Sequence, residues 1–139
     1  MKNNLTYLLL FFVPLLLADT CKKSDVTPCF EIKKLAQRWK NAHIAVQAYG
    51  INNKVLESYN LHPEGIFTLM NNGSYKVISD DIPLDGKWQI DYPGCKLTLD
   101  NGTNKQRTFV IEKLSNDSLV ISRKDTLGMV IYTQHYKRN

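Results

Sequence analysis

The sequence has few of the residues and motifs on which enzymes and metalloproteins depend. Its three histidines, His43, His62 and His135, are far apart, and their spacing puts no two on one strand face or helix turn. The three cysteines also lack the close spacing of zinc ligands. A nucleophile elbow, a phosphate-binding glycine loop and a zinc-binding helix motif are all missing. We therefore expect no metal, no cofactor and no enzymatic activity.

The chain also lacks a concentration of positive charge. Its formal net charge is +5, but the basic residues are scattered along the sequence and do not form a stripe with stacking aromatics. Nucleic-acid-binding proteins typically have a basic stripe of that kind. We expect no nucleic-acid partner, and we attribute the surplus to solubility and to weak attraction toward anionic lipid headgroups.

The longest apolar run is too short for a permanent membrane span. It covers residues 5–18 and follows the single basic residue Lys2. A helix of that length reaches ~21 Å, whereas the hydrocarbon core of a bilayer is about 30 Å thick. A basic start, a short apolar stretch and a small-residue exit are typical of a secretory signal. We assign residues 1–20 to a signal peptide.

The end of this leader, Leu-Leu-Ala-Asp-Thr-Cys, resembles a bacterial lipoprotein signal, in which the cysteine becomes the first mature residue and carries lipid. The resemblance implies lipidation at Cys21, a tether over residues 21–28 and a membrane partner held through the lipid anchor. Lys22 follows the cysteine, which in such lipoproteins implies sorting to the outer membrane. The alternative is ordinary cleavage near Ala18, which leaves Cys21 as a plain thiol.

Lipidation of Cys21 leaves Cys29 and Cys95 as an even pair in an oxidising compartment. A disulfide between them would close a loop of about 66 residues and stabilise the fold by ~4 kcal/mol on the chain-entropy model. The alternative is two separate buried thiols, and the sequence leaves both open.

The remaining chain, residues 29–139, reads as one all-β domain. Thr27 and Pro28 favour a short helix over residues 28–38. Beyond it, apolar and polar residues alternate with period two in short segments separated by polar turns such as Asn72-Gly73. This spacing predicts an antiparallel sandwich or barrel, and consecutive hairpins favour a closed up-and-down barrel. The eight predicted strands cover residues 42–48, 66–70, 75–78, 87–91, 95–100, 107–113, 118–123 and 129–137.

The same region resembles the lipocalin-like lipoproteins of Gram-negative envelopes. The likeness is carried by residues 35–39 (LAQRW), 67–75 (FTLMNNGSY), 86–90 (GKWQI) and 109–119 (FVIEKLSNDSL). It implies an eight-stranded antiparallel up-and-down barrel with a short N-terminal helix, and a small apolar ligand. Lipocalins proper carry Gly-x-Trp on the first strand and stack a basic residue of the last strand over that tryptophan. Here Gln37 stands in place of the glycine, and either Lys137 or Arg138 could provide the basic residue.

Two interpretations of the barrel interior follow from its residues. The predicted inward positions contain no Gly, Ala or Ser and five are aromatic, which favours a packed core because each aromatic side chain buries ~150–250 Å². These positions are Phe67, Leu69, Tyr75, Val77, Trp88, Ile90, Leu97, Leu99, Phe109, Ile111, Leu119, Ile121, Val130 and Tyr132. An eight-stranded barrel can also hold one small molecule. The candidate ligand pocket lies between Trp39, Ile44, Tyr75 and Trp88.

These observations support two functional hypotheses. The first is a lipid-anchored envelope lipoprotein whose lipocalin-like domain binds a small apolar ligand. The second is a protein-interaction or structural module of an envelope complex, or an inhibitor, with a packed barrel and no ligand. The second would act through a strand edge or through the predicted loop over residues 49–65, the longest between strands.

Overall fold

The fold is a single β-sheet that closes on itself, with one short helix. The structure, a computed structural model, describes residues 30–79, 82–92 and 94–139. Within these ranges it has one helix and nine strands, in the order α1 (Ile32–Leu35), β1 (Arg38–Tyr49), β2 (Val55–Leu61), β3 (Gly65–Leu69), β4 (Ser74–Ser79), β5 (Ile82–Asp91), β6 (Lys96–Leu99), β7 (Arg107–Leu114), β8 (Ser118–Lys124) and β9 (Val130–Arg138).

Eight of these strands form a closed antiparallel barrel. Strands β3 to β9 are paired in chain order, and β1 joins the two ends of this series by pairing with β3 on one side and β9 on the other. The predicted eight-stranded up-and-down barrel is therefore confirmed. Closure is possible because the chain is a series of hairpins whose turns use the predicted residues; Gly73, for example, has φ +76°.

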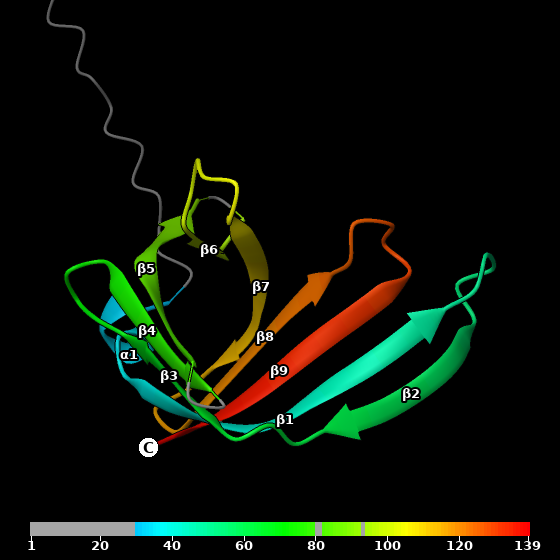
Figure 1. Ribbon diagram of the computed structural model, residues 1–139, viewed down its shortest axis with the longest axis horizontal. Coiled ribbons are helices and arrows are strands. Elements are labelled where there is room, and N and C mark those ends of the chain that lie inside the picture. Colours follow the sequence, from blue (N-terminus) through cyan, green and yellow to red (C-terminus); the bar gives the residue numbers. More distant parts are fainter. Residues whose placement is uncertain (1–29, 80–81, 93) are drawn as a thin grey trace, which may run out of the picture.

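The ninth strand, β2, corrects the prediction of a loop over residues 49–65. It pairs with the second half of β1, from Ile44 to Tyr49, whereas β3 pairs only with Arg38 to Lys40 on the same edge. Figure 1 shows β1 and β2 extending together away from the barrel. The segment becomes a strand because β1 is longer than predicted and offers an edge that β3 does not cover.

The helix is shorter than the predicted residues 28–38. It ends at Leu35, and by Gln37 the backbone already pairs with the sheet, since the Leu69 N–H donates to the Gln37 carbonyl at 3.0 Å. This early sheet pairing limits α1 to four residues; Thr27 and Pro28 lie outside the described residues. No helix in the described ranges is long and apolar enough to cross a membrane.

The hydrophobic core fills the end of the barrel next to α1. Trp39 is fully buried, and its indole N–H donates to the carbonyl of Leu35 at 2.9 Å, which fixes the helix over the barrel. Most of the predicted inward positions are buried here. The buried cluster consists of Leu35, Trp39, Phe67, Leu69, Tyr75, Trp88, Leu97, Leu99, Phe109, Leu119 and Ile121.

Candidate functional site

The candidate site is a cavity of about 240 Å³ inside the barrel, at the end where the β2–β3 link lies. Its walls come from every barrel strand, and apolar side chains predominate. Phe67 and Phe109 connect the cavity to the packed core, because they belong to both. The apolar lining residues of these walls are Ile44, Pro63, Ile66, Phe67, Val77, Leu84, Leu99, Phe109 and Ile121.

Polar side chains interrupt this lining: Arg107 on β7, Ser79 on β4, and Asn41, Gln134 and Tyr136 on β1 and β9. Tyr136, opposite Asn41 in the β1–β9 register, donates its hydroxyl hydrogen to Gln134 Oε1 at 2.7 Å. Burial raises the pKa of Tyr136, so the phenol stays protonated and remains a donor. Asn41 Oδ1 is buried and has no hydrogen-bond partner among the described residues. An apolar cavity with few polar groups is typical of a small-molecule site.

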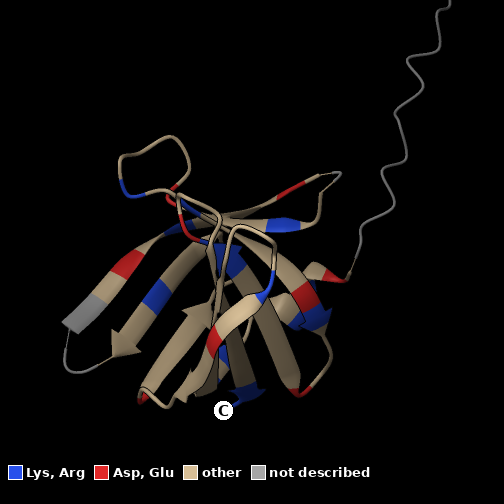
Figure 2. Cartoon of the chain, turned by 90° about the vertical axis from the view of Figure 1, so that its right-hand side faces the viewer, with Lys and Arg blue, Asp and Glu red and all other residues tan. Residues whose placement is uncertain are grey.

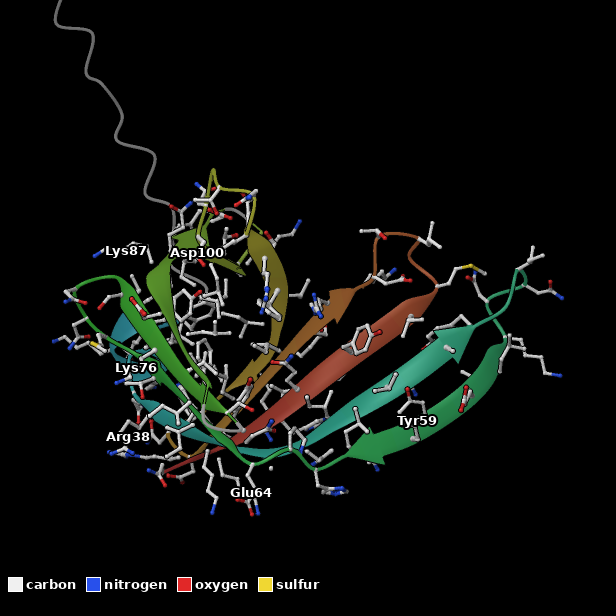
Figure 3. All side chains as sticks on the ribbon, viewed as in Figure 1. Arg38, Tyr59, Glu64, Lys76, Lys87 and Asp100 are labelled. Atoms are coloured by element: carbon white, nitrogen blue, oxygen red, sulfur yellow. The ribbon has the colours of Figure 1, made fainter. Side chains whose placement is uncertain are left out.

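The inner wall of the cavity continues onto an open apolar face. Ile44 lines the cavity and lies opposite Leu61 on β2. Two residues further along β1, Val46 lies between Tyr59 of β2 and Tyr132 of β9, and is only 2% exposed. We call Val46, Tyr59, Leu61 and Tyr132 the apolar platform. Figure 3 shows Tyr59 on the part of β2 that projects beyond the barrel.

One end of the platform carries a positive charge. The guanidinium of Arg123 lies over the ring of Tyr132, with Cζ 5.2 Å from the ring centroid. A cation held on an aromatic face in this way restricts both side chains. The sequence contains a weak strand pattern in this segment, because Tyr59 and Leu61 alternate with the polar residues Ser58 and Asn60. The two platform residues on β2 were missed because that segment was predicted to be a loop.

Of the four residues predicted to form the pocket, Ile44 lines the cavity. Trp39, Tyr75 and Trp88 belong to the packed core, where they are 0%, 8% and 8% exposed. The Trp88 indole N–H donates to the carbonyl of Met70 at 3.0 Å. The structure therefore separates Ile44 from the other three, and the cavity lies on the opposite side of the Phe67–Phe109 layer from α1.

Tyr75 has a structural role that explains the neighbouring glycine. Its hydroxyl donates to Asp100 Oδ2 at 2.6 Å, and Asp100 Oδ1 accepts the Lys87 N–H at 3.1 Å. Burial, followed by this hydrogen bond, raises the pKa of Tyr75 to about 12; the same bond lowers the pKa of Asp100. A Cβ on Gly86 would lie 2.0 Å from Asp100 Oδ1. A side chain at position 86 would therefore force Asp100 and Tyr75 to shift.

The three histidines, expected to be separate, come together on the outer face of the sheet. His43 of β1 lies opposite His135 of β9, and the two rings stack with centroids 4.1 Å apart. The His62 ring centroid is 6.1 Å from that of His43. Burial, followed by the charge of His43, lowers the pKa of His135. In the described part of the chain, no group of three or more His, Cys, Asp or Glu side chains is placed to hold a metal ion.

Several sequence predictions fall on the N-terminal segment. The signal peptide, the lipidated Cys21, the tether and Cys29 all lie outside the described residues. Cys95 is disulfide-bonded, and its predicted pairing with Cys29 stays a prediction because both other cysteines lie in that segment.

Lys137 and Arg138 were the two candidates for a basic residue of the last strand beside Trp39. Arg138, not Lys137, lies opposite Trp39 in the β1–β9 register.

The fold and the cavity together define a closed eight-stranded antiparallel barrel with an apolar interior site. Comparisons with protein-family models, with curated proteins and with solved structures found no match. The resemblance to lipocalin-like lipoproteins stays a prediction.

Proposed function

We propose that this protein is an envelope lipoprotein whose barrel binds a small molecule with an apolar body and a few hydrogen-bonding groups. The observation that carries the proposal is the cavity of about 240 Å³ between the strands of the barrel. This volume lies just below the range of about 300–1,000 Å³ that is typical of small-molecule pockets. A compact ligand, or one end of a longer ligand, would fit.

The apolar platform supports a ligand that is longer than the cavity. It begins beside Ile44 and provides the exposed Tyr59 and the half-buried Tyr132, so a molecule leaving the cavity would still be in contact with apolar surface. Tyr59 and Leu61 are each 46% exposed, and burial of such side chains under a ligand is favourable by ~25 cal/mol per Å².

The cavity can be tested by filling it. The substitution Ile44→Trp places an indole in the lining, and we expect it to abolish the fluorescence gain of an apolar naphthylamine dye that binds the wild-type chain. Ala45→Trp is the matched control, because Ala45 is the next residue on β1 and faces the other side of the sheet. Dye binding that survives Ile44→Trp, or is lost equally in Ala45→Trp, would falsify the cavity as the site.

Natural cargo can be sought by native mass spectrometry on protein from its own cells. We expect a reproducible extra mass that leaves on treatment with organic solvent and that is absent from the Ile44→Trp variant.

The lipid anchor has a separate test, because Cys21→Ala should abolish fatty-acid labelling and release the protein from membranes. Labelling that persists in the variant would contradict lipidation at Cys21.

A second candidate function, protein interaction, is favoured by the exposed edge of β2. Within the described residues β2 pairs only with β1, and all its side chains are exposed, including Leu56 at 71%. An unpaired apolar edge can add a strand from another chain. A photo-crosslinker at position 56 can test this function in cells. Capture of one reproducible protein partner, together with no bound cargo in native mass spectrometry, would favour protein interaction over ligand binding.

A further inference from the structure

Four neighbouring strands of the barrel contain no acidic residue. Strands β3, β1, β9 and β8 lie side by side in that order around the sheet, and none of them includes Asp or Glu. Basic residues are present on three of the four. Figure 2 shows blue Lys and Arg segments beside the C-terminus, where β9 ends. The scattered basic residues of the sequence are therefore brought together by the fold.

The strand registers place four of the six basic residues on these strands, Arg38, Lys40, Lys124 and Lys137, on the outer face of the sheet, whereas Arg123 and Arg138 lie on the register positions of the inner face. Trp39 points into the core, so Arg38 and Lys40 on either side of it point outward. Lys40 lies opposite Lys137 on β9, and Arg38 is connected through Thr68 to Lys76 on β4. Lys124 points outward by the same alternation, since Ile121 on β8 is buried, and a β-bulge after Ile111 places Lys113 opposite the outward Val120. We call Arg38, Lys40, Lys76, Lys113, Lys124 and Lys137 the convex basic face.

The charge of this face is not neutralised internally. All six side chains are exposed, and the one ion pair within the described ranges joins Lys34 to Glu31 at 3.5 Å, away from this face. Acidic residues lie at its borders. Three of them are Glu64 in the β2–β3 link, Asp85 opposite Lys76, and Glu112, which accepts a hydrogen bond from Ser122 at 2.5 Å. Two more are Asp117, whose carbonyl accepts the Arg138 N–H next to Lys137, and Asp125, which follows Lys124.

Apolar side chains are interspersed among the cations. Ile78, which is 44% exposed, follows Lys76 on the same face of β4 and lies opposite Ile66 of β3. Ile66, which is half-buried and also lines the cavity, is opposite Lys40. A surface that combines Lys and Arg with exposed aliphatic side chains suits the boundary between lipid headgroups and acyl chains.

We propose that the convex basic face rests on an anionic, phosphate-bearing bilayer surface. Cations held near such a surface contribute about fivefold each to binding. Because the face is on the outside of the barrel wall, the platform on the other side of β1 and β9 would face away from the bilayer and stay accessible. The proposal does not depend on ligand binding, and it differs from lipid anchoring because it concerns the orientation of the folded domain.

The test compares the full chain on vesicles of phosphatidylcholine with the full chain on vesicles that also contain phosphatidylglycerol. Co-sedimentation should increase with phosphatidylglycerol and decrease with added salt, because salt screens charges beyond about 10 Å at 0.1 M. Amine acetylation read by mass spectrometry should show Lys40 and Lys137 protected only on the anionic vesicles. Lys54 and Lys105, exposed and outside this face, should be acetylated equally on both.

Two charge-matched variants sharpen the test. Lys40→Gln with Lys137→Gln should weaken binding to anionic vesicles roughly tenfold or more, while Lys54→Gln with Lys105→Gln should change it less than about twofold. Lys40→Arg with Lys137→Arg should retain binding, which separates charge from folding defects. Equal losses in the two glutamine variants, or wild-type binding that ignores phosphatidylglycerol, would overturn the proposal. Protection of Lys40 and Lys137 in cells but not on vesicles would assign the face to a protein partner and overturn it too.

Discussion

The two halves of β1 have the same alternating sequence pattern but very different surroundings. In the first half Trp39 is fully buried, between β3 on one side and β9 on the other, with α1 above it. In the second half β1 pairs with β2, whose side chains are all exposed. Figure 1 shows the first half inside the barrel and the second half extending from it.

This comparison shows that alternation alone does not bury a side chain. Where β3 to β7 curve over β1 (Figure 1), a facing layer buries Trp39 completely. Beyond that point Val46 is still only 2% exposed, but its cross-strand neighbours Tyr59 and Tyr132 stay partly exposed. The cavity lies at the transition between the two halves, where the opposite wall is still present but the packing is no longer complete.

The largest expected effect on stability is in the first half of β1, which lies inside the barrel. Trp39→Ala should lower the free energy of unfolding by ~3–5 kcal/mol, because it removes a fully buried indole and its hydrogen bond to Leu35. Tyr59→Ala, in the open half, should cost less than ~1 kcal/mol. Urea unfolding of both variants measures the contrast. Similar losses would mean that the two halves of β1 are equally packed.

A smaller effect is expected at the glycines of the two regions. Gly86→Ala should cost ~1–3 kcal/mol, because its Cβ would lie 2.0 Å from Asp100 Oδ1 and 2.7 Å from Tyr75 Cε1. Gly50→Ala, next to the open hairpin, has its closest contact at 3.4 Å, with the mobile end of Leu56, and should stay within about 0.5 kcal/mol of wild type. Thermal unfolding distinguishes the two; a tolerated alanine at position 86 would contradict the close packing around Asp100.

The smallest effect concerns the histidine pair at the seam between β1 and β9. Folding lowers the pKa of His135 below the usual value near 6.5, so the unfolded chain binds more protons between the two values. Stability should therefore fall as the pH drops below about 6.5, and level off below the folded pKa. The facing groups are His43, His62 and the outward lysines Lys40 and Lys137, all neutral or cationic, so none offsets the added charge.

The control variant keeps the pairing of β1 with β9 but replaces His135 by a side chain that does not titrate. His135→Gln should flatten the loss of unfolding free energy between about pH 7.5 and about pH 5.5, while His62→Gln, at an exposed position, should leave most of it. If the free energy of unfolding of the wild type does not change over that pH range, protonation of His135 beside His43 does not destabilise the fold, which would contradict this prediction.

Much of the barrel could be predicted from the sequence because each strand has a buried and an outward side. The segments around Phe67, Leu97 and Leu119 alternate cleanly, and turn residues such as Asn72-Gly73 separate them, so strands and hairpins follow from local chemistry. Strand β2 was missed because both its faces are exposed. A segment that has little to bury gives a weak period-two signal, and its pairing is decided by the free edge of β1.

The site was less predictable than the fold. The prediction placed the pocket between Trp39, Ile44, Tyr75 and Trp88, yet the three aromatic residues pack tightly in the core. The cavity depends instead on where the opposing walls fail to meet, which involves residues such as Asn41, Gln134 and Leu84 from distant strands. The histidine cluster was missed for a related reason, since His43 and His135 are neighbours only through the β1–β9 register.

The sequence by itself determined the class of fold: its period-two alternation and polar turns produce short antiparallel strands, and these are local properties of the chain. The tertiary structure alone decided how far closure extends, which left a cavity beside Ile44, an open platform on β2 and a basic outer face around Lys40 and Lys137. The physical reason is that burial and charge density depend on distances between strands, and those distances are set only when β9 returns to pair with β1.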